Sequence, residues 1–199
     1  MQRLSNITID IPDAHVCVWP AFFSRETSDR FMHILSEEID WKQERLTIYG
    51  KTHDLPRLTA WYGDIGKVYR YSGIELVPKP WIPALLEIKD AIEGISPDTA
   101  FNSVLLNMYR SGRDCVSWHS DDEPELGSEP IIGSVSLGQS RSFQFKHKKT
   151  RMEKRSIVLN SGDYMLMKGS TQKNWLHQVP RSAKNLGPRI NLTFRQIGD

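Results

Sequence analysis

The sequence predicts a mainly β protein with flanking helices, of the α+β class, in which a β sandwich or barrel is supported by two helices. Short β-rich runs separated by turn signals fill the chain after residue 100, a spacing typical of sandwiches and barrels. Two segments before residue 100 instead show helical periodicity. No repeat or linker divides the 199 residues, so we expect one domain covering residues 1–199, large enough for a substantial core.

The first predicted helix spans about residues 25–40. Ser24 is a typical N-cap residue, and apolar side chains recur behind it at helical spacing, at Phe31, Ile34, Leu35 and Ile39. Pro83 suits the first turn of a second helix that Gly94 ends. Between them, four glycines within residues 44–73 favour hairpins and loops.

The strands are predicted from short apolar or alternating runs. These runs cover residues 103–109, 131–137, 141–146, 156–159, 163–167, 175–179 and 189–196. Turn residues such as those of Asn160-Ser161-Gly162-Asp163 separate them. Seven or eight strands of this length are enough for two packed sheets or a barrel, with the helices against one sheet.

The composition is that of a soluble globular protein, with 39% hydrophobic and 25% charged residues. A net charge of +2 means that any contact with nucleic acid needs the basic residues gathered on one face. Cys17 and Cys115 are too few for a disulfide framework or a Cys-rich zinc site, which favours a reducing compartment. No segment has transmembrane length, and residues 1–13 lack the apolar core of a signal peptide. We therefore expect an intracellular protein with no membrane partner.

His119, Asp121 and the distant His177 are candidate metal ligands. Residues two apart in an extended segment point to one side, so His119 and Asp121 can face one ion. Two imidazoles and one carboxylate suit Fe(II) and would also accept Mn, Co, Ni or Zn. Each residue also has a plainer reading, because His177 could be a hydrogen-bonded strand histidine and Asp121 a loop acid in an Asx-turn.

The last predicted strand carries two arginines on one face. Alternation along residues 189–195 separates the polar Arg189, Asn191, Thr193 and Arg195 from the apolar Ile190, Leu192 and Phe194. Guanidinium groups on a strand must be solvated or paired with anions, and the two carboxylates of a short diacid would serve. Asn107 and Tyr109 form a second polar pair on one face. The alternative is the solvent-facing side of an edge strand.

Taken together, these residues resemble the AlkB family of iron- and 2-oxoglutarate-dependent dioxygenases, which remove alkyl groups from nucleic-acid bases, and most of all its members acting on duplex DNA. The resemblance extends from about residue 44 to the end. Its motifs are Asn107-x-Tyr109, Trp118-His119-Ser120-Asp121-Asp122-Glu123, Pro130-Ile131-Ile132, the Arg-Ser-Phe run at 141–143, His177 and Pro188-Arg189-x-Asn191-Leu192-Thr193-Phe194-Arg195. It implies a double-stranded β-helix (jelly-roll) over residues 100–199, behind an N-terminal helical buttress.

The resemblance also implies roles for individual residues. Fe(II) would be bound by His119, Asp121 and His177, with O2 and 2-oxoglutarate as co-substrates. Arg189 would pair with the distal carboxylate of 2-oxoglutarate, and Arg195 would lie near its metal-proximal carboxylate. The remaining hydrogen bonds to this co-substrate would come from Asn107, Tyr109 and Asn191. The implied reaction hydroxylates an N-methyl group and releases formaldehyde, succinate and CO2.

Residues 44–80 resemble the family's wedge hairpin and nucleotide-recognition lid. A base must leave its stack to reach a buried iron. The resemblance places Ile48 and Tyr49 at the hairpin tip to fill the gap, and Arg57 against the strands near the lesion. Tyr71 would stack on the damaged base opposite His119, with Tyr69 close by. The plainer reading of Arg45–Lys51 is an ordinary β-hairpin.

Glu123 could accept a hydrogen bond from the exocyclic amine of adenine or cytosine. That amine is a reason to expect 1-methyladenine and 3-methylcytosine as substrates, and their cationic rings would gain from aromatic stacking. The basic run from Lys146 to Arg155 is either a phosphate-contacting hairpin loop or a solvated turn.

Three functions remain open from the sequence. The first is a monomeric demethylase that prefers duplex DNA. The second is the same chemistry on single-stranded DNA or RNA, or on a protein side chain. The wedge and the tyrosines argue against the protein side chain. The third is a catalytically silent nucleic-acid-binding module. We expect a cytoplasmic location if the protein is bacterial and a nuclear one if it is eukaryotic.

Overall fold

The computed structural model describes residues 5–48, 50–67, 69–71, 74–150 and 154–198. The helices are α1 (Arg25–Glu38), α2 (Pro83–Glu93) and α3 (Thr171–Asn174), with a 3-10 turn at Pro124–Leu126. The strands before α2 are β1 (Ile7–Thr8), β2 (His15–Trp19), β3 (Arg45–Ile48), β4 (Lys51–Asp54), β5 (Leu58–Gly63), β6 (Tyr69–Tyr71) and β7 (Ile74–Leu76). Those after it are β8 (Ser103–Tyr109), β9 (Val116–His119), β10 (Ile132–Gly138), β11 (Arg141–His147), β12 (Lys154–Leu159), β13 (Tyr164–Lys168), β14 (Trp175–Val179) and β15 (Arg189–Arg195).

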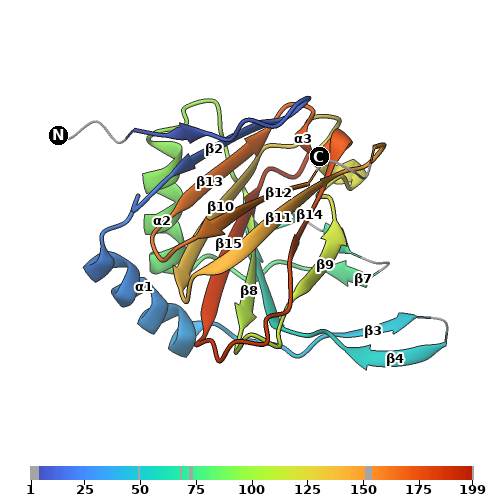
Figure 1. Ribbon diagram of the computed structural model, residues 1–199. Helices are drawn as coiled ribbons and strands as arrows, with labels where there is room; N and C mark the ends of the chain where they lie inside the picture. The colour runs from blue at the N-terminus through green and yellow to red at the C-terminus, as the bar shows by residue number, and fades with distance from the viewer. Residues whose placement is uncertain (1–4, 49, 68, 72–73, 151–153, 199) are drawn as a thin grey trace.

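Two antiparallel sheets form the body of the molecule (Figure 1). The larger has the order β1-β2-β13-β10-β15-β8-β5, and the smaller β12-β11-β14-β9. The strands from β8 to β15 are shared between the two sheets. The larger sheet contains β8, β10, β13 and β15, and the smaller contains β9, β11, β12 and β14. This is the strand arrangement of a double-stranded β-helix. The predicted jelly-roll is therefore confirmed, and each strand predicted after residue 100 is present within two residues of its expected limits.

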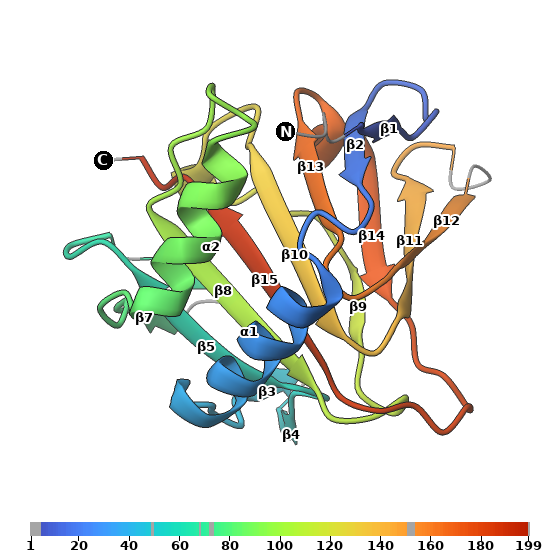
Figure 2. The ribbon, with the colours of Figure 1, turned by 90° about the vertical axis from the view of Figure 1, so that its left-hand side faces the viewer.

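Helices α1 and α2 cover the outer face of the larger sheet (Figure 2). Ser24 caps α1 by accepting a hydrogen bond from the Thr27 backbone N–H, and Pro83 begins α2, as the sequence predicts. Phe31 and Leu35 of α1 pack in one core cluster with Leu85 and Ile88 of α2 and with the outward side chains of β15. This apolar layer supports the sheet whose opposite face carries the site.

Two hairpins, β3–β4 and β6–β7, lie outside the main sheets. Strand β3 pairs with β4, and β6 pairs with β7. The β3–β4 hairpin projects away from the body of the molecule, and Gly50 next to its tip has a φ of +74°, which glycine adopts without strain (Figure 1). Strand β5 joins the larger sheet beside β8, so the hairpins are anchored to the strand that carries Asn107 and Tyr109.

Strands β1, β2 and β9 and helix α3 were not among the elements predicted from the sequence. Strand β2 pairs with β13 in the larger sheet. Cys17 and Cys115 are both free and buried. Among the described residues, no helix is long and apolar enough to cross a membrane.

Candidate metal centre and co-substrate pocket

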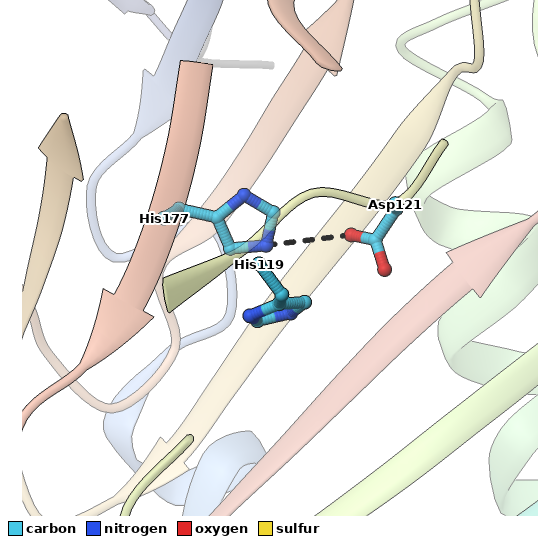
Figure 3. Close-up of side chains that lie close together, drawn as sticks. All are labelled: His119, Asp121 and His177. Carbon is cyan, nitrogen blue, oxygen red and sulfur yellow. Dashed lines mark ion pairs between the residues drawn. The ribbon is translucent and has the colours of Figure 1, made fainter. Parts of the chain in front are cut away.

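The three candidate metal ligands converge between the two sheets (Figure 3). His119 ends β9, Asp121 follows it by two residues, and His177 lies in β14 directly opposite His119 in the antiparallel register. One ligand atom from each residue lies within 4.8 Å of the other two. Strand pairing therefore fixes the two imidazoles, and the chain leaving β9 supplies the carboxylate.

His119 is oriented by its own strand. Its Nδ1 lies 2.8 Å from the Ser117 carbonyl oxygen. Because a carbonyl can only accept, Nδ1 carries the proton and Nε2 keeps its lone pair for a metal. Burial, helped by the nearby His177, lowers the pKa of His119 to about 4. The imidazole is thus neutral at pH 7, as metal binding requires.

Asp121 is buried and ionised. Arg195 Nη2 donates to its Oδ1 at 2.5 Å, and His177 Nε2 lies 3.5 Å from its Oδ2. Burial favours the neutral acid, but the Arg195 guanidinium and His177 outweigh it and hold the pKa of Asp121 well below its usual range. Arg195 occupies one carboxylate oxygen and leaves the other directed towards the histidines.

These donors fit Fe(II). Two neutral imidazoles and one carboxylate on one side of a cavity form the ligand set of non-haem iron oxygenases, which leaves positions open for other ligands. Phe143 stacks on His177 with ring centroids 5.2 Å apart, so the ring is also held from its apolar side.

The predicted co-substrate residues surround the same cavity. Its lining includes Asn107, Tyr109, Asn191 and Arg195 together with the three metal ligands. Asn191 donates to the Ser134 hydroxyl at 3.0 Å and to the Val135 carbonyl at 3.2 Å. Its amide is therefore fixed by β10 on the inner face of the larger sheet.

Arg189 is paired with Tyr109 in the strand register, is not among the residues that line the cavity, and is only 1% exposed. Its Nη2 donates to Ser136 at 2.8 Å and to Asn191 at 3.1 Å. Within the described part of the chain, Nε and Nη1 have no hydrogen-bond partner. Burial lowers the pKa of Arg189 to about 10, although the neighbouring Tyr109 raises it. A buried cation with unused donors is a suitable site for a carboxylate.

Arg57 lies in the pocket and not on an exposed surface. It is 5% exposed, and its Nε donates to the Asn107 Oδ1 at 2.7 Å, while Nη1 donates to the Cys115 carbonyl at 3.3 Å. With these partners the buried guanidinium orients Asn107 in the cavity wall. The predicted contact of Arg57 with the nucleic-acid strands stays a prediction.

The remaining base-recognition residues are placed less fully. Tyr49 lies outside the described residues, as do the side chains of Ile48, Tyr69 and Tyr71. Glu123 is half-buried and is not among the residues that line the cavity. Its predicted contact with a base, and those of the tyrosines, stay predictions.

Three residues that sequence reasoning missed also shape the site. Arg141 donates to three backbone carbonyls around Tyr109, Gln172 contacts the backbone of Asp121, and Met167 lines the cavity. Alternation in β11 places Arg141 on the buried face with Phe143 and Phe145, so an arginine on an apolar face was the available signal. For Gln172 the sequence offered no indication of a role in the site, apart from its being a polar residue close to a predicted strand.

Comparison with known proteins identifies the family. Residues 15–195 match the 2OG-Fe(II) oxygenase superfamily. The chain is 40% identical to the mouse alpha-ketoglutarate-dependent dioxygenase alkB homolog 3, over 92% of this chain and 66% of the relative. It is 39% identical to the human DNA oxidative demethylase ALKBH2, over 91% of this chain and 73% of the relative. It thus spans about two thirds of the length of the mouse protein.

The fold is shared as well. The solved structure of OsALKBH1 superimposes with a TM-score of 0.64 at 20% identity, covering 94% of this chain and all of that one. Fe(II), 2-oxoglutarate and O2, the predicted cofactor and co-substrates, are those of the matched superfamily. The sequence match, the fold and the His119-Asp121-His177 cluster together show that the chain belongs to the AlkB family of 2OG-Fe(II) oxygenases.

Proposed function

We propose that the protein is an oxidative demethylase that repairs N-alkylated bases, 1-methyladenine and 3-methylcytosine, in DNA. The observation that supports this most is the buried His119-Asp121-His177 cluster beside Arg195, in a chain whose relatives include a DNA oxidative demethylase. The products are the unmodified base, formaldehyde, succinate and CO2. The protein acts as a monomer, in the cytoplasm of a bacterium or the nucleus of a eukaryote.

The three ligands hold the iron, which with 2-oxoglutarate and O2 supplies the oxidising chemistry that the side chains lack. His119 presents a neutral ring nitrogen, His177 presents a second imidazole nitrogen, and Asp121 presents one carboxylate oxygen. The pocket excludes water by burial, since Asp121 and His177 are 3% and 4% exposed. Exclusion of water limits unproductive oxidation.

Charge also favours a dianionic co-substrate. Three guanidinium groups, those of Arg57, Arg189 and Arg195, lie buried at or behind the cavity wall. Among the described residues that line the cavity, Asp121 is the one carboxylate, and it is paired with Arg195. In this assignment Arg189 binds the distal carboxylate of 2-oxoglutarate, Arg195 lies near the proximal one, and Asn107, Tyr109 and Asn191 complete the hydrogen bonds.

Duplex DNA is the preferred substrate in this proposal because of the projecting β3–β4 hairpin (Figure 1). Its tip, Ile48-Tyr49, fills the space that the extruded base leaves in the stack. Tyr69, Tyr71 and Glu123 then hold that base beside His119. The same chemistry on single-stranded DNA or RNA is the second candidate, and it is an outcome of the assay below.

The test supplies Fe(II), 2-oxoglutarate, ascorbate and O2 with matched duplex and single-stranded oligonucleotides containing 1-methyladenine. Succinate and formaldehyde are measured together. We expect equimolar products and faster turnover on the duplex. No turnover on either substrate would refute the demethylase assignment, and faster turnover on single strands would favour the second candidate.

Variants separate the parts of the proposal. Asp121→Ala should abolish turnover while oligonucleotide binding persists, and Asp121→Asn, which keeps the shape, should behave alike. Tyr49→Ala should slow turnover on the duplex more than on single strands. Thr47→Ala is the matched control, because Thr47 lies in the stem of the same hairpin, where its hydroxyl hydrogen-bonds to that of Thr52. Equal effects of Tyr49→Ala on both substrates would remove the wedge.

A further inference from the structure

Gln172 is a fully buried polar side chain beside the metal centre. It lies in α3, the single helical turn that leads directly into β14 with His177, and it is 0% exposed. A buried glutamine amide costs free energy unless its oxygen and nitrogen are hydrogen-bonded. Its partners therefore indicate what it does.

The amide joins two walls of the site. Its Oε1 accepts a hydrogen bond from the Asp121 backbone N–H at 3.0 Å. Its Nε2 lies 3.6 Å from the sulfur of Met167, which lines the cavity. Because a backbone N–H can only donate, the oxygen of the amide must face Asp121, and the orientation of the side chain is fixed.

The bond matters because Asp121 lies beyond the end of β9. His119 is the last residue of that strand, so sheet pairing does not hold the backbone of Asp121. Arg195 holds the carboxylate at Oδ1, and Gln172 holds the backbone from which this carboxylate projects. Two contacts from different elements thus set the position of one ligand.

We propose that Gln172 is a positioning residue for Asp121, whose acceptor oxygen keeps the carboxylate in line with His119 and His177. The inference rests on the proposed function, because it takes Asp121 as a metal ligand. Partners of this kind behind a ligand commonly change metal affinity ~10–100-fold when removed. Methionine at position 172 has nearly the same volume but no acceptor, so it leaves the Asp121 N–H buried without a partner. Glutamate keeps an acceptor oxygen in the same place.

The experiment titrates Mn(II) into the metal-free protein without oxygen and measures the dissociation constant. Mn(II) takes the same ligand types as Fe(II) but does not turn over. We expect Gln172→Met to weaken Mn(II) binding ~10–100-fold and Gln172→Glu to stay close to wild type. Gln178→Met is the matched control, because Gln178 lies in β14 with its amide bonded to Gln144 and away from the cavity. It should bind Mn(II) as wild type does.

Each outcome decides the matter. All variants are titrated at a temperature where circular dichroism shows them folded, so a loss of affinity is not a loss of fold. Wild-type affinity in Gln172→Met, or equal losses in Gln172→Met and Gln172→Glu, would overturn the positioning role. If Asp121→Ala binds Mn(II) as tightly as wild type, the proposed metal site itself fails, which is a different result from failure at Gln172 alone.

Discussion

The two faces of β15 are built from opposite chemistry. Ile190, Leu192 and Phe194 point to the outer face, are 0% exposed and pack beneath α1 and α2. Arg189, Asn191 and Arg195 point between the sheets and are almost as deeply buried. Burial on the outer face stabilises the fold, whereas burial of guanidinium groups on the inner face costs free energy unless anions compensate. The outer side chains of β15 therefore stabilise the fold, and its inner side chains form part of the site.

A second contrast lies within the charged region, around the ring of Tyr109. The guanidinium carbons of Arg141 and Arg189 lie 5.5 Å and 5.2 Å from the centre of that ring. Arg141 donates to the carbonyls of Ser111, Asp114 and Pro180. Arg189 keeps Nε and Nη1 without a hydrogen-bond partner among the described residues. We infer that Arg141 serves the fold and Arg189 serves a ligand.

The largest effect on stability is expected from the outer face. Phe194→Ala should lower the free energy of unfolding by about 3–5 kcal/mol, because it removes buried apolar surface and leaves a cavity in the core. Urea unfolding monitored by fluorescence measures this. Val158→Ala, at a side chain that is 61% exposed, should change the value by less than about 0.5 kcal/mol. Similar losses in the two variants would contradict the assignment of the core to this face.

A smaller loss is expected from Arg141→Met. It removes the donors to three backbone carbonyls, and hydrogen bonds from charged groups contribute about 1.5–3 kcal/mol each before non-additivity. We expect a net loss of about 2–3 kcal/mol in the same unfolding experiment, since removal of a buried charge offsets part of it. An unchanged unfolding free energy would show that Arg141 is not structural.

The smallest effect concerns pH and the outer layer. Burial raises the pKa of Tyr164 well above its usual value, and a hydrogen bond with Ser96 opposes this shift. The stability that depends on the neutral Tyr164 phenol is complete below about pH 10, the pKa of tyrosine in the unfolded chain. It is lost as the pH rises above this value towards the raised pKa of the folded state. The difference in unfolding free energy between Tyr164→Phe and wild type should therefore change by about 1.4 kcal/mol in favour of the variant when the pH is raised from about 8 to about 11. Urea unfolding at both pH values tests this, and a difference that does not change with pH would contradict it.

The strands and ligands were predictable because they depend on local pattern. Alternation in Arg189–Arg195 placed the arginines on one face, and the spacing of His119 and Asp121 placed both towards one cavity. The N-cap Ser24 placed the start of α1. These features follow from the periods of strand and helix, which the sequence displays directly.

The remaining parts depend on contacts between distant residues. Arg57 directly precedes β5, yet its guanidinium turns into the pocket and donates a hydrogen bond to Asn107 of β8, the strand that pairs with β5. Gln172 and Asp121 are 51 positions apart, and no periodicity relates them. Strand β2 completes the larger sheet only because β13 is there to pair with it. The residues that these elements contact in the fold decide their positions more than local propensity does.

The most direct test of the contrast between the two faces is the thermal shift that 2-oxoglutarate produces in the Mn(II)-loaded protein. A ligand that binds the folded state raises the melting temperature according to its concentration and affinity. The outer-face variant Phe194→Leu should melt lower than wild type but keep the full shift. Arg189→Met should melt within a few degrees of wild type without 2-oxoglutarate and lose the shift when it is added. A shift of wild-type size in Arg189→Met would contradict the assignment of the charged face to the co-substrate.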